Sequence, residues 1–168
     1  MEYSISPITD KDREPIIDIF NYYVENSFAA YPESKLPYQA FDMFMQMSKN
    51  LPTATIKDQN GKALGFGMLR TYNPMPAFSH TVEITYFIDA EYTGKGLGKV
   101  LLGFLEKEGR KKGIATILAN ISSVNDGSIN FHKNNGFIEC GCFRKVGIKN
   151  GKLFDSIWMQ KMLYQDKE

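Results

Sequence analysis

The 168-residue sequence has only two cysteines, two histidines and one tryptophan, and this scarcity excludes some classes of site. On a strand, Cys140 and Cys142 would project from one face about 6.5 to 7 Å apart, which is awkward for a disulfide. Structural zinc sites usually combine two short-spaced pairs of Cys or His, and the sequence contains no second pair. We therefore expect two small packed thiols and no bound metal.

The sequence also lacks an excess of one charge and any long apolar run. Twenty basic and 19 acidic residues give a formal net charge of +1 without a block of like charge, so neither nucleic acid nor a membrane surface is an expected partner. No run approaches the roughly 18 apolar residues of a spanning helix, and Met1-Glu2-Tyr3 does not resemble a signal peptide. We expect one cytoplasmic domain, residues 1–168, with a small-molecule partner.

Apolar spacing, caps and turns predict a regular order of elements. After a short strand-like start, helical spacing is found at 16–24 and 41–47, and further helices are predicted at 96–112 and 125–135. Strands are predicted at 53–57, 63–70, 81–88, 114–121, 137–148 and 152–162. Asn60-Gly61 and Asn150-Gly151 indicate hairpins, whereas a helix joins 81–88 to 114–121 and makes them parallel. The predicted fold class is α+β, with a mostly antiparallel mixed sheet and one parallel crossover.

The segment Gly94-Lys95-Gly96-Leu97-Gly98 lies between a predicted strand and an amphipathic helix. Glycines let the backbone approach a ligand closely, and the first helical turn leaves N–H groups unpaired, so such a loop suits phosphate. A nucleoside-triphosphate loop needs Ser or Thr where Val100 stands. A dinucleotide loop needs glycine in place of Lys99 and an acidic residue in strand 114–121, which has none. Both of these loop types are excluded.

Five motifs follow one another along the chain: Phe20-Asn21-Tyr22-Tyr23-Val24, His80-Thr81-Val82-Glu83, the glycine loop, the segment 125–137 and Trp158-Met159-Gln160. In this order they resemble the GNAT superfamily of N-acetyltransferases, and within it the phosphinothricin and methionine sulfone acetyltransferase group. The resemblance extends over nearly the whole chain. It implies the GNAT acyltransferase fold, acetyl-CoA as the acetyl donor and no metal.

The resemblance also implies where the donor binds. In the family, the strand before the glycine loop carries a bulge and splays from its parallel neighbour, and the pantetheine arm lies in the gap. Asn125 would contact the pantetheine or adenosine part. The family loop starts with Arg or Gln where this chain has Thr93, so we expect weakened binding. The implied donor-binding residues are Tyr86, Phe87, Ile88, Thr93, Gly94, Lys95, Gly96, Leu97, Gly98, Lys99 and Asn125.

Two residues are candidates for proton transfer. A primary ammonium with a pKa of about 10.4 is neutral in roughly one molecule in two thousand at pH 7, so a general base is useful. The resemblance assigns this role to Glu83, directly or through a water; the alternative is an ordinary strand carboxylate paired with Lys or Arg. His132 stands where many family members have a Tyr acid and could protonate the leaving thiolate, or it could be an ordinary polar side chain.

The resemblance implies a small amino acid-like amine as acceptor. Arginines that grip the substrate carboxylate in relatives are replaced here by Asn73 and Met75, and Arg70 could substitute if its strand turns it inward. His80 lies three residues before Glu83, which on a strand places it on the opposite face. The candidate acceptor-binding residues are Phe28, Tyr31, Glu33, Arg70, Tyr72 and His80.

Members of the resembled group commonly form dimers, so a homodimer is expected. One alternative function stays open at this point, a GNAT-like module that binds CoA for sensing or stability without catalysis. Thr93 and the missing arginines favour that alternative, and the presence of both Glu83 and His132 argues against it.

Overall fold

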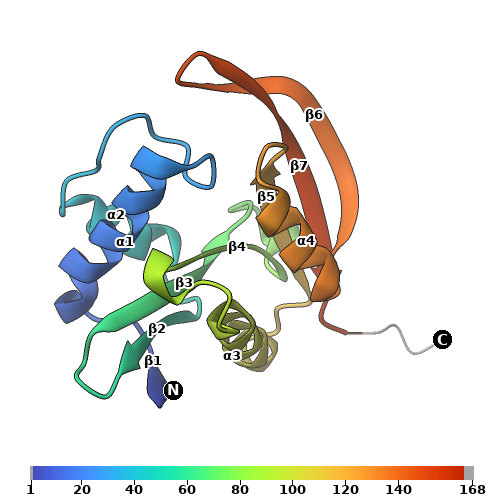
Figure 1. Cartoon of the computed structure of the whole chain (residues 1–168). Coiled ribbons are helices and arrows are strands. Elements are labelled where there is room, and N and C mark those ends of the chain that lie inside the picture. Colours follow the sequence, from blue (N-terminus) through green and yellow to red (C-terminus); the bar gives the residue numbers. More distant parts are fainter. Residues whose placement is uncertain (1, 165–168) are drawn as a thin grey trace.

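The computed structural model describes residues 2–164 and contains the helices and strands predicted from the sequence (Figure 1). The helices are α1 (Arg13–Asn26), α2 (Ala40–Met47), α3 (Leu97–Lys111) and α4 (Asp126–Asn134). The strands are β1 (Tyr3–Ser6), β2 (Thr53–Asp58), β3 (Ala63–Thr71), β4 (Thr81–Ile88), β5 (Thr116–Ser122), β6 (Ile138–Lys149) and β7 (Lys152–Met162).

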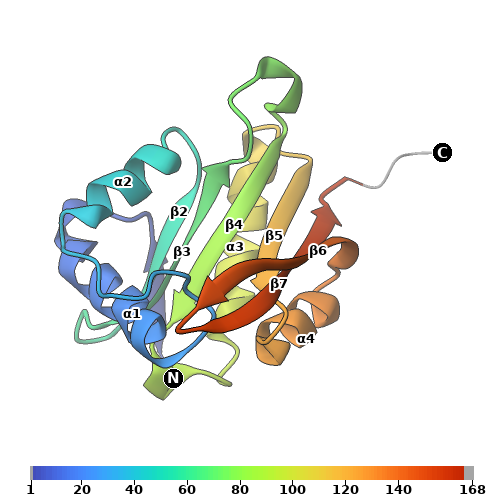
Figure 2. The same cartoon turned by 90° about the horizontal axis from the view of Figure 1, so that it is seen from above.

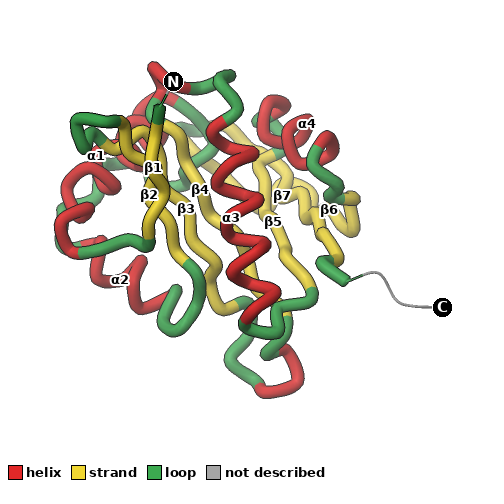
Figure 3. Tube along the Cα trace, turned by 90° about the horizontal axis from the view of Figure 1, so that it is seen from below, coloured by secondary structure: helices red, strands yellow, loops and turns green. Residues whose placement is uncertain are grey.

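The strands form one seven-stranded sheet in the order β1-β2-β3-β4-β5-β7-β6. Only β4 and β5 are parallel, and the other neighbours are antiparallel, which confirms the predicted α+β class. Helices α1 and α2 cover one face (Figure 2), whereas α3 lies across the other (Figure 3). Two apolar clusters result, one under α1 and α2 and one under α3 and α4.

Helix α3 lies against the sheet through an apolar stripe. Leu97, Leu101 and Leu105 are buried at helical spacing, and Gly96 precedes the helix with a φ of +82°. The helix approaches β3 so closely that a Cβ on Gly67 would lie 3.0 Å from Leu105 Cδ1. This close packing holds α3 against the sheet, and the glycine loop leads directly into its first turn.

The parallel pair β4–β5 is short. It includes only Thr81↔Thr116, Val82↔Ile117 and Glu83↔Leu118, although both strands continue beyond these residues. Strand β5 stays paired with β7 over its whole length, and β4 stays paired with β3 to its end, so the two strands diverge after Glu83. The expected splay is present. The expectation of a bulge in β4 was wrong, because the register of β4 with β3 has no shift.

The C-terminal hairpin has the predicted turn, with left-handed φ values of 49° at Asn150 and 74° at Gly151. Strand β6 forms an edge of the sheet, and its residues 138–146 are all exposed. Cys140 and Cys142 are therefore exposed free thiols, and the expectation of packed thiols was wrong. Within residues 2–164, no helix combines the length and apolar character needed to cross a bilayer.

We predict that Leu105→Ala lowers the free energy of unfolding by about 2–5 kcal/mol, because it opens a cavity between α3 and β3 in a fully buried contact. Urea denaturation measures the change. Lys107→Ala, on the exposed side of the same helix, is the control and should change the free energy by less than about 0.5 kcal/mol. A loss of similar size in both variants would contradict the packing described above.

Candidate functional site

A cavity of about 880 Å³ opens where β4 and β5 diverge. Residues 83–88 of β4 and 119–122 of β5 form its middle. Its two ends are lined by different parts of the chain, the glycine loop with the start of α4 at one end and the loop after α1 with the end of β3 at the other. One continuous space therefore links the glycine loop with the predicted base, Glu83.

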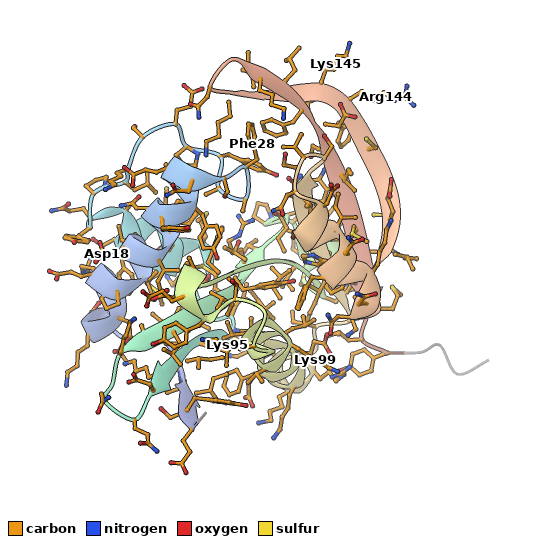
Figure 4. The ribbon with its side chains drawn as sticks, in the orientation of Figure 1. Asp18, Phe28, Lys95, Lys99, Arg144 and Lys145 are labelled. Carbon is orange, nitrogen blue, oxygen red and sulfur yellow. The ribbon has the colours of Figure 1, made fainter. Side chains whose placement is uncertain are left out.

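The glycine-loop end is suited to an anion. Gly94 and Gly96 have φ values of 73° and 82°, a left-handed conformation that favours glycine. The first N–H groups of α3 have no acceptor inside the helix, and their positive partial charge faces the loop. Figure 4 shows Lys95 and Lys99 near the beginning of α3. Lys95 Nζ donates to the Glu91 carbonyl at 2.9 Å, so its ammonium group lies beside the residues that precede the glycine loop.

Only some of the residues predicted to hold the donor line the cavity. Thr93, Gly94, Gly98 and Asn125 line the cavity, as do the three β4 residues Tyr86, Phe87 and Ile88. The loop residues Lys95, Gly96, Leu97 and Lys99 do not line it. Asn125 Oδ1 also accepts a hydrogen bond from Ser128 N at 3.2 Å and so caps α4.

At the other end, Arg70 and Glu83 form an ion pair across β3 and β4. Arg70 Nη2 lies 2.8 Å from Glu83 Oε2, and Arg70 Nε donates to Thr85 Oγ1 at 2.8 Å. The two side chains are 25% and 17% exposed, and both line the cavity. Strand β3 thus turns Arg70 inward, toward the cavity. Glu83 lines the cavity, as a general base would, and it is also paired with an arginine, as an ordinary strand carboxylate would be.

Tyr31 borders the same end of the cavity. Its hydroxyl donates to Asn120 Oδ1 at 2.6 Å, and Asn120 Nδ2 donates to Ser156 Oγ at 2.7 Å. Burial of the hydroxyl, with the Glu83 charge as a smaller cause, raises the pKa of Tyr31 to about 12. Sequence reasoning missed Asn120, although a polar side chain inside the apolar strand 114–121 was a usable signal.

His132 reaches the cavity from α4 and forms a pair with Tyr86. The Tyr86 hydroxyl lies 2.6 Å from His132 Nε2, and His132 Nδ1 lies 2.7 Å from the Ser128 carbonyl oxygen. Because a carbonyl only accepts, Nδ1 carries the ring proton and Nε2 accepts from Tyr86. Burial lowers the pKa of His132, although the bond to Ser128 opposes this, and burial raises the pKa of Tyr86. The side-chain contact of Tyr86 was not predicted.

Glu83 and the Tyr86–His132 pair belong to opposite faces of β4, because side chains alternate along a strand. Glu83 shares its face with Thr85 and Phe87, and Phe87 packs under α1 and α2. Tyr86 packs in the cluster under α3 and α4. Both groups border the gap between β4 and β5. They therefore line a single cavity, although they do not contact each other.

Four predicted acceptor residues lie outside the cavity lining. Phe28 packs edge-on against Phe154, with ring centres 5.9 Å apart. Glu33 Oε1 accepts from Asn150 N at 2.7 Å. Tyr72 is exposed, and exposed His80 accepts from Ala115 N through its carbonyl. Arg70 and Tyr31 are the predicted acceptor residues that the structure does bring to the cavity.

Among residues 2–164, no group of three His, Cys, Asp or Glu side chains is arranged to hold a metal ion.

Comparison with known proteins gives this geometry a family. The Acetyltransferase (GNAT) family matches residues 16–137. The chain belongs to the GNAT family. It is an acetyl-CoA-dependent N-acetyltransferase, which confirms the predicted enzyme class.

This GNAT enzyme is 32% identical to an L-methionine sulfoximine/L-methionine sulfone acetyltransferase of Pseudomonas paraeruginosa, over 95% of this chain and 94% of that protein. It is 27% identical to the phosphinothricin N-acetyltransferase of Alcaligenes faecalis, over 95% and 82%. A phosphinothricin acetyltransferase from Sinorhizobium meliloti, solved with acetyl-CoA, is 26% identical with a TM-score of 0.89 over 96% of this chain and 89% of that one. The predicted GNAT fold is confirmed.

The lowered pKa of His132 predicts a pH effect on stability. The unfolded chain binds a proton at this histidine below about pH 6.5, whereas the folded GNAT enzyme does so only at lower pH. The stabilising contribution of neutral His132 to the free energy of unfolding is therefore present above about pH 6.5. This contribution is lost as the pH falls below about 6.5. Denaturant titrations from pH 7.5 to 5 should show the stability advantage of wild type over His132→Gln shrinking with acidity. An advantage independent of pH would contradict the assignment, and His80→Gln is the control for losing a histidine.

Proposed function

We propose that this GNAT enzyme transfers the acetyl group of acetyl-CoA to the amine of a small amino acid-like acceptor. The observation that carries the proposal is the continuous cavity between the glycine loop and the Arg70–Glu83 pair. The relatives that are named for phosphinothricin and for methionine sulfoximine and sulfone support an acceptor of this kind. Family membership favours this enzyme over a non-catalytic CoA-binding module.

The donor fits the end formed by the glycine loop and the open edge of β4. A pyrophosphate at the loop would be met by the N–H groups of Leu97 and Gly98, the first two residues of α3. Beyond Glu83, β4 has no strand partner on its β5 side. Backbone N–H and C=O groups on that edge are available to the amide groups of a pantetheine arm. Acetyl-CoA would then deliver its thioester to the gap beside Glu83.

The acceptor fits the opposite end through its charges. Arg70 Nη1 contacts only the weak acceptor Met47 Sδ, at 3.9 Å, among the described residues. A guanidinium edge without a strong acceptor can hold a carboxylate. The wall beside it is apolar and includes Phe20, Phe44 and Met68. An acceptor with a carboxylate, a nearby amine and an apolar body therefore suits this end, with its amine beside Glu83.

Transfer requires that the amine lose a proton as its nitrogen attacks the thioester carbonyl. The C–N bond forms, the C–S bond breaks and CoA leaves as a thiolate, whose conjugate acid has a pKa of about 8.5 and which therefore departs readily. Glu83 is the proposed acceptor of the amine proton. His132 is neutral, with Nε2 occupied by the Tyr86 hydroxyl, so it holds no proton there to donate. We therefore assign His132 no acid role in the resting state.

We also propose that the enzyme is a homodimer, with the exposed side of the β6–β7 hairpin in the interface. An unpaired edge strand with large apolar side chains is a typical association surface. The large apolar side chains on this hairpin that are more than half exposed are Ile138, Phe143, Val146, Ile148, Leu153 and Met162.

Glu83→Gln should lower the turnover of L-methionine sulfone or phosphinothricin by about 100- to 10,000-fold at pH 7, because the base is lost. The deficit should shrink as the pH approaches the amine pKa, where the acceptor is already neutral. Release of free CoA thiol measures the rate. Glu108→Gln, on the surface of α3, is the matched control and should behave as wild type. Equal rates for wild type and Glu83→Gln at every pH would remove Glu83 from the mechanism.

Thr93→Arg should tighten CoA binding by about tenfold, because it restores a charged donor at the entry of the glycine loop. Isothermal titration calorimetry measures the change in Kd. Thr71→Arg adds the same charge at the far end of β3 and serves as the control. If Thr93→Arg binds CoA no better than Thr71→Arg does, then Thr93 is not a site of weakened affinity.

A further inference from the structure

Lys149, the last residue of β6, is only 1% exposed. Lysine is almost never fully buried unless its charge is matched. Here Nζ donates to three backbone carbonyl oxygens, those of Val24, Ser27 and Ala30, each at 2.7 Å. An ammonium has three N–H donors, so these three bonds use its whole donor capacity. Burial lowers the pKa of Lys149, and the nearby Glu33 carboxylate opposes this effect.

The three carbonyls belong to the end of α1 and the loop that follows it. Val24 lies in the last turn of the helix, Ser27 is its C-cap and Ala30 lies in the loop. The last carbonyls of a helix lack partners inside it and carry negative partial charge, so a cation there is favourable. Lys149 thus caps the C-terminal end of α1, although it lies more than 100 residues away in sequence.

Other contacts join the same hairpin to the same loop. Glu33 accepts from the backbone N–H of Asn150 in the hairpin turn. The Phe154 ring stacks on Tyr31, with centres 5.5 Å apart. A Cβ on Gly147 would lie 2.2 Å from Phe154 Cζ, so this ring occupies space that only glycine leaves open. In Figure 1 the hairpin tip reaches toward the end of α1, and Figure 4 shows Phe28 between them.

The loop fixed in this way forms part of the cavity wall. Ser27, Ala30 and Tyr31 line the acceptor end, and the Tyr31 hydroxyl bonds to Asn120 on the opposite side of that space. The Lys149 side chain itself does not line the cavity. An effect of Lys149 on the acceptor therefore passes through this loop, in which Tyr31 carries the hydroxyl that bonds across the cavity.

We propose that Lys149 is a positioning residue for acceptor binding, which holds residues 27–33 so that Tyr31 borders the acceptor beside Glu83 and Arg70. The inference rests on the proposed function for the location of the acceptor. The donor end of the cavity is formed by other elements, the glycine loop and α4, so acetyl-CoA binding does not depend on this lysine.

The test compares Lys149→Met with Lys152→Met. Both residues belong to the hairpin and both ammonium groups lie near the Phe28 ring, at 5.9 and 5.5 Å from its centre. Lys152 is exposed, and so its substitution removes a charge without unpairing the three carbonyls. Hydrogen–deuterium exchange of the amides of residues 27–33 is measured on both variants and on wild type, without acceptor. Steady-state kinetics with L-methionine sulfone then gives KM for the acceptor and for acetyl-CoA separately.

We expect Lys149→Met to exchange faster at residues 27–33 and to raise KM for the acceptor by about tenfold or more, with KM for acetyl-CoA changed by less than about twofold. Lys152→Met should match wild type in both measurements. In the Tyr31→Phe background, Lys149→Met should raise the acceptor KM by a smaller factor, because the same contact is already weakened. A merely structural role would not produce this dependence on Tyr31.

Three results would overturn the inference: unchanged exchange at 27–33, faster exchange with an unchanged acceptor KM, or an equal rise in both KM values. If Lys149→Met does not fold, Lys149→Arg is judged by the same criteria, since a planar guanidinium cannot satisfy three carbonyls arranged around one nitrogen. The exchange measurement needs no acceptor. It therefore separates a failure of the lysine contact from a failure of the proposed function, which would appear as absent turnover by wild type.

Discussion

The site depends on one constraint of the sheet. Strands β4 and β5 each stay paired with their other neighbour, and because those neighbours diverge, β4 and β5 cannot stay paired with each other. Strand β5 follows β7 along its full length, while β4 follows β3. The parallel pairing stops at Glu83 and Leu118. The exposed strand edges leave polar backbone groups without strand partners, and such groups need another partner, either water or a ligand. The sheet thereby creates both the cavity and a requirement for something polar to fill it.

The gap has a second consequence because side chains alternate across a strand. One face of β4 presents Glu83 to Arg70, and the other presents Tyr86 to His132. In a closed sheet these two pairs would be separated by the backbone layer. Opening the sheet after Glu83 gives a ligand in the gap access to both. The ion pair and the neutral pair differ because Glu83 faces a cation, whereas His132 faces a carbonyl and a hydroxyl.

Local patterns were sufficient for the elements and for the residues adjacent to them in sequence. The strand at 81–88, the glycine loop and the turn at Asn150-Gly151 all follow from signals within a few residues. The partners could not be predicted in this way. The contact of Arg70 with Glu83 requires the register of β3 on β4, and the contact of Lys149 with Val24 requires the whole sheet to be assembled. The exposure of Cys142 likewise depends on β6 being an edge strand.

The Arg70–Glu83 pair leaves one edge of a single guanidinium for a second partner. Arg70 Nη2 is bonded to Glu83 Oε2, whereas Nη1 contacts only Met47 Sδ among the described residues. Under the proposed function, an acceptor carboxylate on Nη1 would be held at a fixed position relative to Glu83, because both bind the same planar group. An acceptor without a carboxylate would lack this contact, and its amine would not be held beside the base. Discrimination between amines would therefore be expressed in the rate of transfer as well as in binding.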